Sequence, residues 1–252
     1  IGIVSSPSFL WTGPNGYTAN IQEPINYAPT ALNQGVYTVT LTDGNGCTAS
    51  STVNITVSTC PDVVLPLKIF IEGYYTGAST MTPALINQGV GISNIVVDTV
   101  IIELRNFTFP HILYATTQAV LNTDGSIEAH FPSNTSGNFY VVIKHRNAIE
   151  TWSSSSVFLQ ETTSLYDFTT AANKAYGANQ IEVESGVWAL YSGDLNSDEN
   201  IDLLDLSNLE ADINTFQFGY FATDINGDGN VDLLDAATVE NNVASFIFSI
   251  QP

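Results

Sequence analysis

Short stretches in which apolar and polar residues alternate dominate the first two thirds of the chain. Residues 35–42 alternate cleanly, and residues 51–57 do so again after the turn sequence Asp-Gly-Asn-Gly at 43–46. Alternation over four to eight residues is typical of a half-buried β-strand, and a glycine-rich turn between two such runs is typical of a hairpin. The pattern therefore predicts a β-hairpin in the N-terminal region.

Further strand-like runs follow, separated by clusters of Asn, Asp, Ser and Gly. They lie at 67–71, 99–104, 126–131, 139–143 and 181–183. No regular alternation of strands with longer helical patterns is present, so a parallel sheet with crossover helices is not expected. The chain is predicted to be mainly β, with a β-sandwich over residues 67–190.

The N-terminal part resembles the immunoglobulin-like modules of bacterial surface proteins. Trp11 stands where such a module places a buried strand tryptophan, and Tyr37 stands at the tyrosine of the corner motif. Only ten residues precede Trp11, too few for the usual first two strands. The resemblance predicts an immunoglobulin-like sandwich at 1–59, truncated or completed by a strand from elsewhere, and a proline-containing linker follows at 60–66.

An acidic pattern of twelve residues occurs twice near the C-terminus. Residues 194–205 align with residues 224–235, thirty positions further on. Oxygen ligands at loop positions 1, 3, 5, 9 and 12, with a backbone carbonyl at position 7, can surround a hard cation of the size of calcium. The pattern predicts two calcium ions, and the predicted ligands are Asp194, Asn196, Asp198, Asn200, Asp202 and Asp205 in the first loop and Asp224, Asn226, Asp228, Asn230, Asp232 and Asp235 in the second.

Two details of the repeat carry further expectations. Position 8 is apolar in both copies, Ile201 and Val231, which predicts that the two loops pair with each other through a short β-bridge. Position 6 is Glu199 in the first loop but Gly229 in the second. Because the turn at position 6 favours a positive φ, which glycine adopts without strain, we expect the first site to be more strained and weaker.

The repeat resembles dockerin domains more than helix–loop–helix calcium sensors. Position 12 is Asp in both copies, a strand-like run at 187–193 replaces an entering helix, and one short helical pattern follows each loop, at 206–214 and 236–243. The resemblance implies a small α dockerin-like domain at 191–252. It also implies docking on a cohesin module through positions 10 and 11, which are Leu203, Leu204, Leu233 and Leu234.

These four leucines allow two interpretations. They form an apolar docking surface, or they anchor the two helices to the core of the domain or to the neighbouring sandwich. Anchoring is the commoner role of leucines at the start of an amphipathic helix, and it is the interpretation that we favour.

Charge narrows the possible partners. The chain has five Lys and Arg against 25 Asp and Glu, a net charge of -20, and residues 191–252 contain no Lys or Arg at all. Nucleic acid and anionic membranes both require cationic side chains, so neither is an expected partner, and no apolar run is long enough to insert in a membrane. Metal cations are the natural counter-ions of the acidic segment.

Other candidate chemistry is sparse. The chain shows no H-E-x-x-H, no G-x-S-x-G and no glycine-rich phosphate loop, and the two cysteines make no disulfide framework, so we expect a protein that is not an enzyme. Residues 144–146 (Lys-His-Arg) either bind an anionic group, such as a carboxylate of the acidic end, or form a solvated strand end paired with Glu150. A carbohydrate platform is a further alternative to core packing for the aromatic residues Tyr74, Tyr75, Trp152 and Trp188.

Residues 67–252 also resemble a C-terminal module of large secreted proteins of Bacteroidota that use type IX secretion, on the motifs at 67–75, 142–152 and 166–171 together with the paired loops. This resemblance implies an extracellular, secreted or surface-attached protein. The predicted function is a non-catalytic segment of an adhesin or filament protein that mediates assembly through a protein partner or self-association. The alternative is the accessory dockerin end of a secreted polysaccharide-degrading enzyme whose catalytic domain lies outside this chain.

Overall fold

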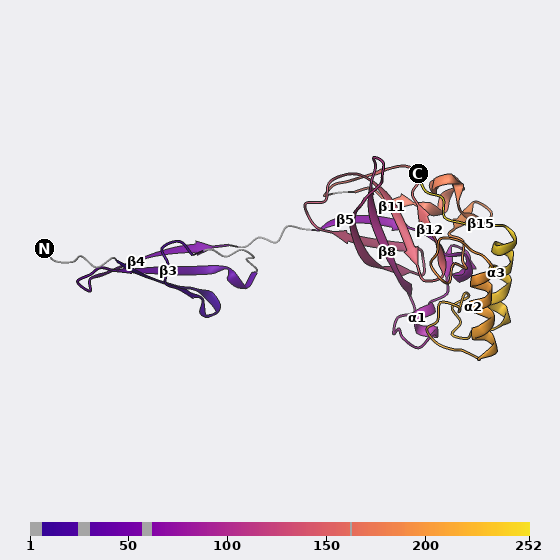
Figure 1. The fold of residues 1–252 in the computed structure, drawn as a ribbon, viewed down its shortest axis with the longest axis horizontal. Coiled ribbons are helices and arrows are strands. Elements are labelled where there is room, and N and C mark those ends of the chain that lie inside the picture. Colours follow the sequence, from indigo (N-terminus) through magenta and orange to yellow (C-terminus); the bar gives the residue numbers. More distant parts are fainter. Residues whose placement is uncertain (1–6, 25–30, 57–61, 162) are drawn as a thin grey trace. The chain divides into compact units, whose positions relative to one another are not determined.

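The protein is mainly β and divides into two compact units, Ile1–Cys60 and Pro61–Pro252. The computed structural model describes residues 7–24, 31–56, 62–161 and 163–252 (Figure 1). Cys60 and the end of the strand predicted at 51–57 lie outside the described residues. Within the described parts of the chain, no helix is long and apolar enough to cross a membrane.

The N-terminal unit contains one antiparallel sheet with the strand order β2-β1-β3-β4. Its strands are β1 (Ser8–Thr12), β2 (Thr18–Ala19), β3 (Gly35–Thr42) and β4 (Thr48–Ile55). The predicted hairpin is β3–β4, and its turn forms because the Asp43 carboxylate accepts the backbone N–H groups of Asn45 and Cys47 at 2.9 and 2.8 Å. No second sheet lies among the described residues of this unit.

Tyr37 and Trp11 differ in how well they match the immunoglobulin-like expectation. Tyr37 is buried, and its hydroxyl donates to the backbone carbonyl of Asn33 at 2.9 Å, four residues upstream, which is the bond of a tyrosine corner. Trp11 is only half-buried, against the prediction of a buried strand tryptophan, because a single sheet leaves one side of its indole without a facing layer.

The second unit is a β-sandwich followed by two helices. Its elements are β5 (Val63–Lys68), β6 (Tyr75–Gly77), β7 (Thr80–Met81), α1 (Ala84–Asn87), β8 (Val96–Asn106), β9 (Leu113–Asn122), β10 (Ser126–Phe131), β11 (Gly137–His145), β12 (Ala148–Trp152), β13 (Val157–Leu159), β14 (Tyr166–Asp167), β15 (Ile181–Glu184), β16 (Val187–Ala189), α2 (Leu203–Asn214) and α3 (Leu233–Ala244).

Two sheets enclose the main core of this unit. One has the order β10-β5-β14, and the other has the order β12-β11-β8-β9 with β13 paired to β11. Alternate residues of β5 are buried, and so are alternate residues along the middle of β8, as expected for strands with one face toward a core. Their inward side chains join one cluster that also includes Phe70, Phe131 and Phe168.

The first strand of the sandwich begins inside the predicted linker. β5 starts at Val63, and Leu65 is fully buried, so most of 60–66 is part of the sandwich rather than a connection. Pro66 misled the sequence interpretation. It is tolerated because it pairs with Glu128 of β10 on one side, whereas β14 reaches only Leu67 and Lys68 on the other.

The C-terminal helices belong to the same compact unit as the sandwich. The chain reaches them through β16, as the strand-like run without an entering helix predicts, and isolated bridges join Ile71 to Leu190 and Ala148 to Ser192. Ile149 of β12 packs into the small core of the helical part. Figure 1 shows α2 and α3 next to each other at the edge of the sandwich.

We expect Leu65→Ala to lower the free energy of unfolding of this unit by about 2–5 kcal/mol, because it removes a fully buried side chain from a packed core. The matched control is Leu165→Ala, whose side chain is 55% exposed and whose removal should cost less than about 1 kcal/mol. Urea denaturation measures both. Equal and small effects would mean that residue 65 lies in a linker after all.

Candidate functional site

The two acidic loops, loop 1 (residues 194–205) and loop 2 (residues 224–235), lead directly into α2 and α3. The position-9 carboxylates cap the helices, because Asp202 accepts the N–H of Leu204 at 2.7 Å and Asp232 accepts that of Leu234 at 2.8 Å. Reciprocally, position 12 accepts the N–H of position 9 at 2.9 Å in both loops, which completes a capping box. The helices therefore begin three residues earlier than the predicted 206 and 236.

The position-12 carboxylate also closes each loop. The other oxygen of Asp205 accepts the N–H groups of Leu195 and Asn196 at 2.8 and 3.2 Å. In loop 2, Asp235 does the same for Ile225 and Asn226 at 2.8 and 3.0 Å. One buried side chain thus joins the start of each loop to the first turn of the helix that follows.

Position 1 organises the middle of each loop. The Asp194 carboxylate accepts the N–H groups of Asp198 and Glu199, both at 3.2 Å. Asp224 accepts those of Gly227 and Gly229, both at 2.9 Å. The loop backbone therefore curls around a buried carboxylate in both copies.

Positions 3, 5 and 7 supply exposed oxygen atoms. The Asn196 amide donates to Asp198 at 2.9 Å, and the Asn226 amide donates to Asp228 at 3.0 Å. In the described part of the chain, no three Asp, Glu, His or Cys side chains converge into a metal-binding group by themselves. A cation in either loop would therefore also need the asparagine side chain and the position-7 carbonyl, and this all-oxygen donor set suits calcium.

Burial raises the pKa of carboxylates in both loops, because it disfavours their charged form. Desolvation, reinforced by the charge of Asp205, raises the pKa of Asp194 to about 6. Desolvation also raises the pKa of Asp235 to about 6, with the charge of Asp224 adding to the effect. Hydrogen bonds from the backbone oppose these shifts without cancelling them, so each loop holds more negative charge than its own donors compensate.

The predicted bridge between the two loops is wrong. Asn200 of loop 1 bridges to Phe248, which follows α3, and Asn230 of loop 2 bridges to Phe218, which follows α2. The N–H of Ile201 accordingly donates to Ile247 at 2.9 Å, and that of Val231 donates to Gln217 at 3.0 Å. Each loop pairs with the exit segment of the other repeat, because position 8 is needed in the core between the helices.

The two loops differ in their surroundings. In loop 2, a Cβ at Gly229 would lie 2.5 Å from the carbonyl oxygen of Asn87, and one at Gly227 would lie 2.8 Å from Ala84. Loop 2 thus packs tightly against α1, and its glycines are needed for space as well as for positive φ. Loop 1 has Ser197 at φ 58° and Glu199 at φ 70° in the equivalent places, where both residues are exposed.

Glu199 is therefore strained as expected, and Ser197 is a second strained position that the sequence interpretation missed. A serine at position 4 gives no strong signal, because many loops accept it. The weaker affinity of loop 1 stays a prediction.

A buried polar network attaches loop 2 to the sandwich. Arg146 donates to Asp98 at 2.8 Å, to the hydroxyl of Tyr74 at 2.6 Å and to the backbone carbonyl of Phe221. Gln88 connects this network to the loop, since it donates to the position-1 carboxylate of Asp224 at 2.7 Å. Residues 144–146 are thus not simply a solvated strand end, and Arg146 binds the C-terminal region through a carbonyl rather than a carboxylate.

Asp98 is the ionic partner of the network. Burial by itself would raise its pKa, but the hydrogen bond from His145 and the charges of His145 and Arg146 outweigh desolvation and lower the pKa to about 2. Lys144 behaves as predicted and pairs with Glu150 at 2.8 Å, with Glu103 as a second partner at 3.3 Å. No sequence spacing could relate Asp98 or Gln88 to the acidic loops.

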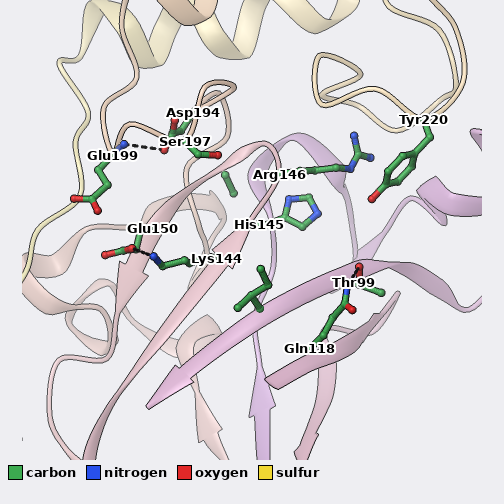
Figure 2. A pocket seen from close by; sticks show the side chains of 12 residues that line it. Thr99, Gln118, Lys144, His145, Arg146, Glu150, Asp194, Ser197, Glu199 and Tyr220 are labelled. Atoms are coloured by element: carbon green, nitrogen blue, oxygen red, sulfur yellow. Dashed lines mark hydrogen bonds and ion pairs between the residues drawn. The ribbon is translucent and has the colours of Figure 1, made fainter. Parts of the chain in front are cut away.

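A pocket of about 430 Å³ lies between loop 1 and the outer face of the sandwich. Figure 2 shows Lys144 and Glu150 on the sandwich side and Asp194, Ser197 and Glu199 on the loop side. Lys144 pairs with Glu150 at 2.8 Å, and Gln251 donates to Glu199 at 2.8 Å. Loop 1 therefore faces a pocket, whereas loop 2 is packed against α1.

The leucines at positions 10 and 11 are exposed, so the favoured interpretation that they are anchors is wrong. Their side chains are 67% and 61% exposed at Leu203 and Leu204, and 77% and 69% exposed at Leu233 and Leu234. The core of the helical part contains Leu209 and Val239 instead. These exposed side chains agree with the alternative interpretation, an apolar docking surface.

The aromatic residues considered for a carbohydrate platform are largely internal. Tyr74 is fully buried and Trp152 is 4% exposed, and the Trp152 indole donates to Glu150 at 2.6 Å. Tyr75 and Trp188 are half-buried. These four side chains therefore do not form an exposed planar surface.

Comparison with known proteins agrees with the geometry of the repeat. The model of the dockerin type I domain family matches residues 192–244, which form a dockerin type I domain. Two solved structures of type II Cohesin-X-Dockerin complexes from Acetivibrio cellulolyticus are also similar. The first, a C-terminal interface mutant, is 16% identical with a TM-score of 0.42 and covers 73% of this chain and 99% of that chain. The second, an N-terminal interface mutant, is 14% identical with a TM-score of 0.41 and covers 72% and 99%. No curated protein matches the chain.

Alanine at position 6 should have very different effects in the two loops. We expect Gly229→Ala to destabilise the C-terminal unit by at least about 2 kcal/mol, because the new Cβ meets the Asn87 carbonyl at 2.5 Å and the φ of 93° is unfavourable. Glu199→Ala keeps the existing strain and should cost less than about 1 kcal/mol. Denaturant unfolding at fixed calcium concentration compares them, and similar costs would contradict the asymmetry.

Proposed function

We propose that this chain is a non-catalytic assembly segment of a secreted protein, and that its dockerin domain docks on a cohesin-type protein partner when calcium orders it. The observation that carries the proposal is the match of residues 192–244 to the dockerin type I family, on two loops that each present an exposed leucine pair. Dockerin domains occur in extracellular and cell-surface proteins, where calcium is millimolar.

Calcium would promote docking indirectly, by stabilising the fold of the dockerin domain. The position-12 carboxylate holds both the loop and the helix cap, so a cation that stabilises its charged form stabilises the helix carrying the leucines. In loop 1 the cation would be held by Asp194, Asn196, Asp198, Asp202, Asp205 and the carbonyl of Asn200. In loop 2 it would be held by Asp224, Asn226, Asp228, Asp232, Asp235 and the carbonyl of Asn230.

For the parent protein we favour an adhesin or surface filament, of the kind exported by type IX secretion in Bacteroidota. The N-terminal sheet, with its tyrosine corner, supports a spacer of immunoglobulin-like type. The alternative is the accessory end of a polysaccharide-degrading enzyme. Further immunoglobulin-like repeats on the same polypeptide would favour the first, and a catalytic domain would favour the second.

Calcium removal gives the first test. We expect a chelator to lower the melting temperature markedly, because a ligand present at 100 times its Kd stabilises the native state by about 2.7 kcal/mol per site. Asp198→Asn and Asp228→Asn each remove one exposed position-5 charge without touching the helix caps. Calorimetric titration should find two sites in the unaltered chain and one in each variant. Magnesium is the control cation, and an unchanged melt with no calcium uptake would contradict the proposal.

Partner capture gives the second test. Immobilised cohesin modules of types I and II should retain the chain in calcium and release it in chelator. Replacing both leucine pairs with serine should weaken retention at least tenfold, whereas Leu165→Ser, at an exposed leucine of the sandwich, should not change it. Absence of retention by every module would remove cohesin as the partner class.

A further inference from the structure

A glutamine of the sandwich makes a direct hydrogen bond to a predicted calcium ligand of loop 2. Gln88 is the C-cap residue of α1 and is only 4% exposed, and its amide nitrogen donates to Oδ2 of Asp224 at 2.7 Å. Among the described residues, Gln88 is the only side chain that donates to the position-1 carboxylate of either loop. A hydrogen bond to a charged acceptor is stronger than one between neutral groups, so this contact restrains the carboxylate of Asp224 firmly.

Arg146 determines which end of the Gln88 amide faces the loop. Nη2 of Arg146 donates to Oε1 of Gln88 at 2.9 Å, so the amide oxygen is engaged and the NH2 group is directed at Asp224. An amide turned by half a rotation would place its donors against the guanidinium and its oxygen against the carboxylate. The observed orientation is therefore the one that satisfies both neighbours of Gln88.

The guanidinium of Arg146 is itself held on several sides. Its Nε donates to Asp98 at 2.8 Å, its Nη2 donates to the hydroxyl of Tyr74 at 2.6 Å, and its central carbon lies 4.3 Å from the ring centroid of Tyr220. Asp98 is 1% exposed and Tyr74 is fully buried. A continuous series of buried polar contacts thus leads from β8 of the sandwich, through Arg146 and Gln88, to the first ligand of loop 2.

Loop 1 has no equivalent of this contact. The carboxylate of Asp194 accepts only the backbone N–H groups of Asp198 and Glu199, both at 3.2 Å. In loop 2, the corresponding backbone bonds from Gly227 and Gly229 are shorter, at 2.9 Å, and the bond from the sandwich is added to them. Position 1 is therefore held from within the loop in the first copy, and from within and outside the loop in the second.

We propose that Gln88 is a positioning residue for the calcium site of loop 2, and that the sandwich thereby gives this site the higher calcium affinity of the two. A ligand side chain that is already held in place loses less conformational freedom on binding, and outer-shell partners of metal ligands change metal affinity for this reason. The inference rests on the calcium binding in the proposed function. It adds a cause of unequal affinity that lies outside the repeat and is separate from the backbone strain at Glu199.

Calcium titration of one loop at a time tests the role of Gln88. Asp198→Asn disables loop 1 and Asp228→Asn disables loop 2, so each background reports on the other loop. Methionine has nearly the size of glutamine but cannot donate to Asp224. In the Asp198→Asn background, Gln88→Met should therefore weaken calcium binding to loop 2 by about 10- to 100-fold in calorimetric titration. In the Asp228→Asn background, the same substitution should leave the affinity of loop 1 within about twofold. An equal loss at both loops, or no loss at loop 2, would overturn the inference.

Asn87 provides a matched control in the same short helix. Its amide donates to the backbone carbonyl of Gly227 at 2.9 Å, so it also attaches loop 2 to α1, but it touches no ligand side chain. Asn87→Leu removes this bond at similar size and should weaken calcium binding to loop 2 by less than about threefold. A loss as large as that of Gln88→Met would show that attachment of the loop, rather than positioning of Asp224, sets the affinity, and would overturn the proposed role.

The luminescence of Tb³⁺, used in place of calcium, separates positioning from stability. The difference between its lifetimes in H2O and D2O reports how many water molecules the bound ion carries. In the Asp198→Asn background, Gln88→Met should increase that number in loop 2, because a displaced Asp224 leaves its coordination position to water. Weaker binding with an unchanged number of waters would mean that Gln88 acts only through the stability of the fold, and would contradict a positioning role.

None of these measurements requires a cohesin, so the two proposals fail in different ways. A chain that binds calcium but no cohesin would lose its proposed partner, while the inference on Gln88 would be tested as before. Calcium binding at both loops with no selective loss in Gln88→Met would overturn the inference and leave the proposed function intact. Absence of calcium binding in the unaltered chain would overturn both.

Discussion

The C-terminal domain contains many carboxylates but no Lys or Arg within residues 191–252 to pair with them. Its structure deals with this through one repeated interaction, the position-12 aspartate. One oxygen of Asp205 or Asp235 closes the loop, and the other accepts the N–H of the residue that caps the helix. Loop and helix are consequently one electrostatic unit. Whatever stabilises the charge of that aspartate also stabilises the helix and the surface on it.

The two repeats contact the rest of the unit differently. Loop 2 packs on α1, and its position-1 carboxylate joins the buried network of Gln88 and Arg146. Loop 1 faces a pocket and has room for a serine and a glutamate where loop 2 requires glycines. Positions 4 and 6 are thus packed against α1 in loop 2 and exposed in loop 1. The difference arises from the neighbour of each loop rather than from the ligand pattern.

The helices of the two repeats are tied together crosswise. Each loop bridges to the segment that follows the helix of the other repeat. Unfolding of one repeat would therefore expose the buried position-8 residue of the other, Ile201 or Val231. The same crossing places Phe248 beside Asn200 and Phe218 beside Asn230. Both exposed leucine pairs, Leu203 with Leu204 and Leu233 with Leu234, therefore lie on one crosswise-linked pair of repeats.

Local patterns in the sequence determined a large part of this description. Alternation identified the hairpin of the N-terminal sheet and several strands of the sandwich, because a strand with one buried face needs period two. The thirty-residue repeat identified both loops and the short helices after them, because ligand spacing within a loop is a local property. The resemblance to immunoglobulin-like modules suggested the tyrosine corner at Tyr37, and the hydroxyl of Tyr37 does donate to the carbonyl of Asn33, four residues back.

Tertiary structure decided the features that depend on contacts between distant segments. Pro66 suggested a linker, but pairing with β10 places it in a strand. Apolar residues at position 8 suggested pairing between the loops, but the small core takes both side chains and the bridges form across the repeats. The sequence favoured anchoring for Leu203 and Leu233 over a docking surface, because helical spacing does not say which face meets a neighbour. The core of the helical part contains Leu209 and Val239 and leaves those leucines exposed. Contacts between distant segments also bring Asp98, Gln88 and Arg146 together.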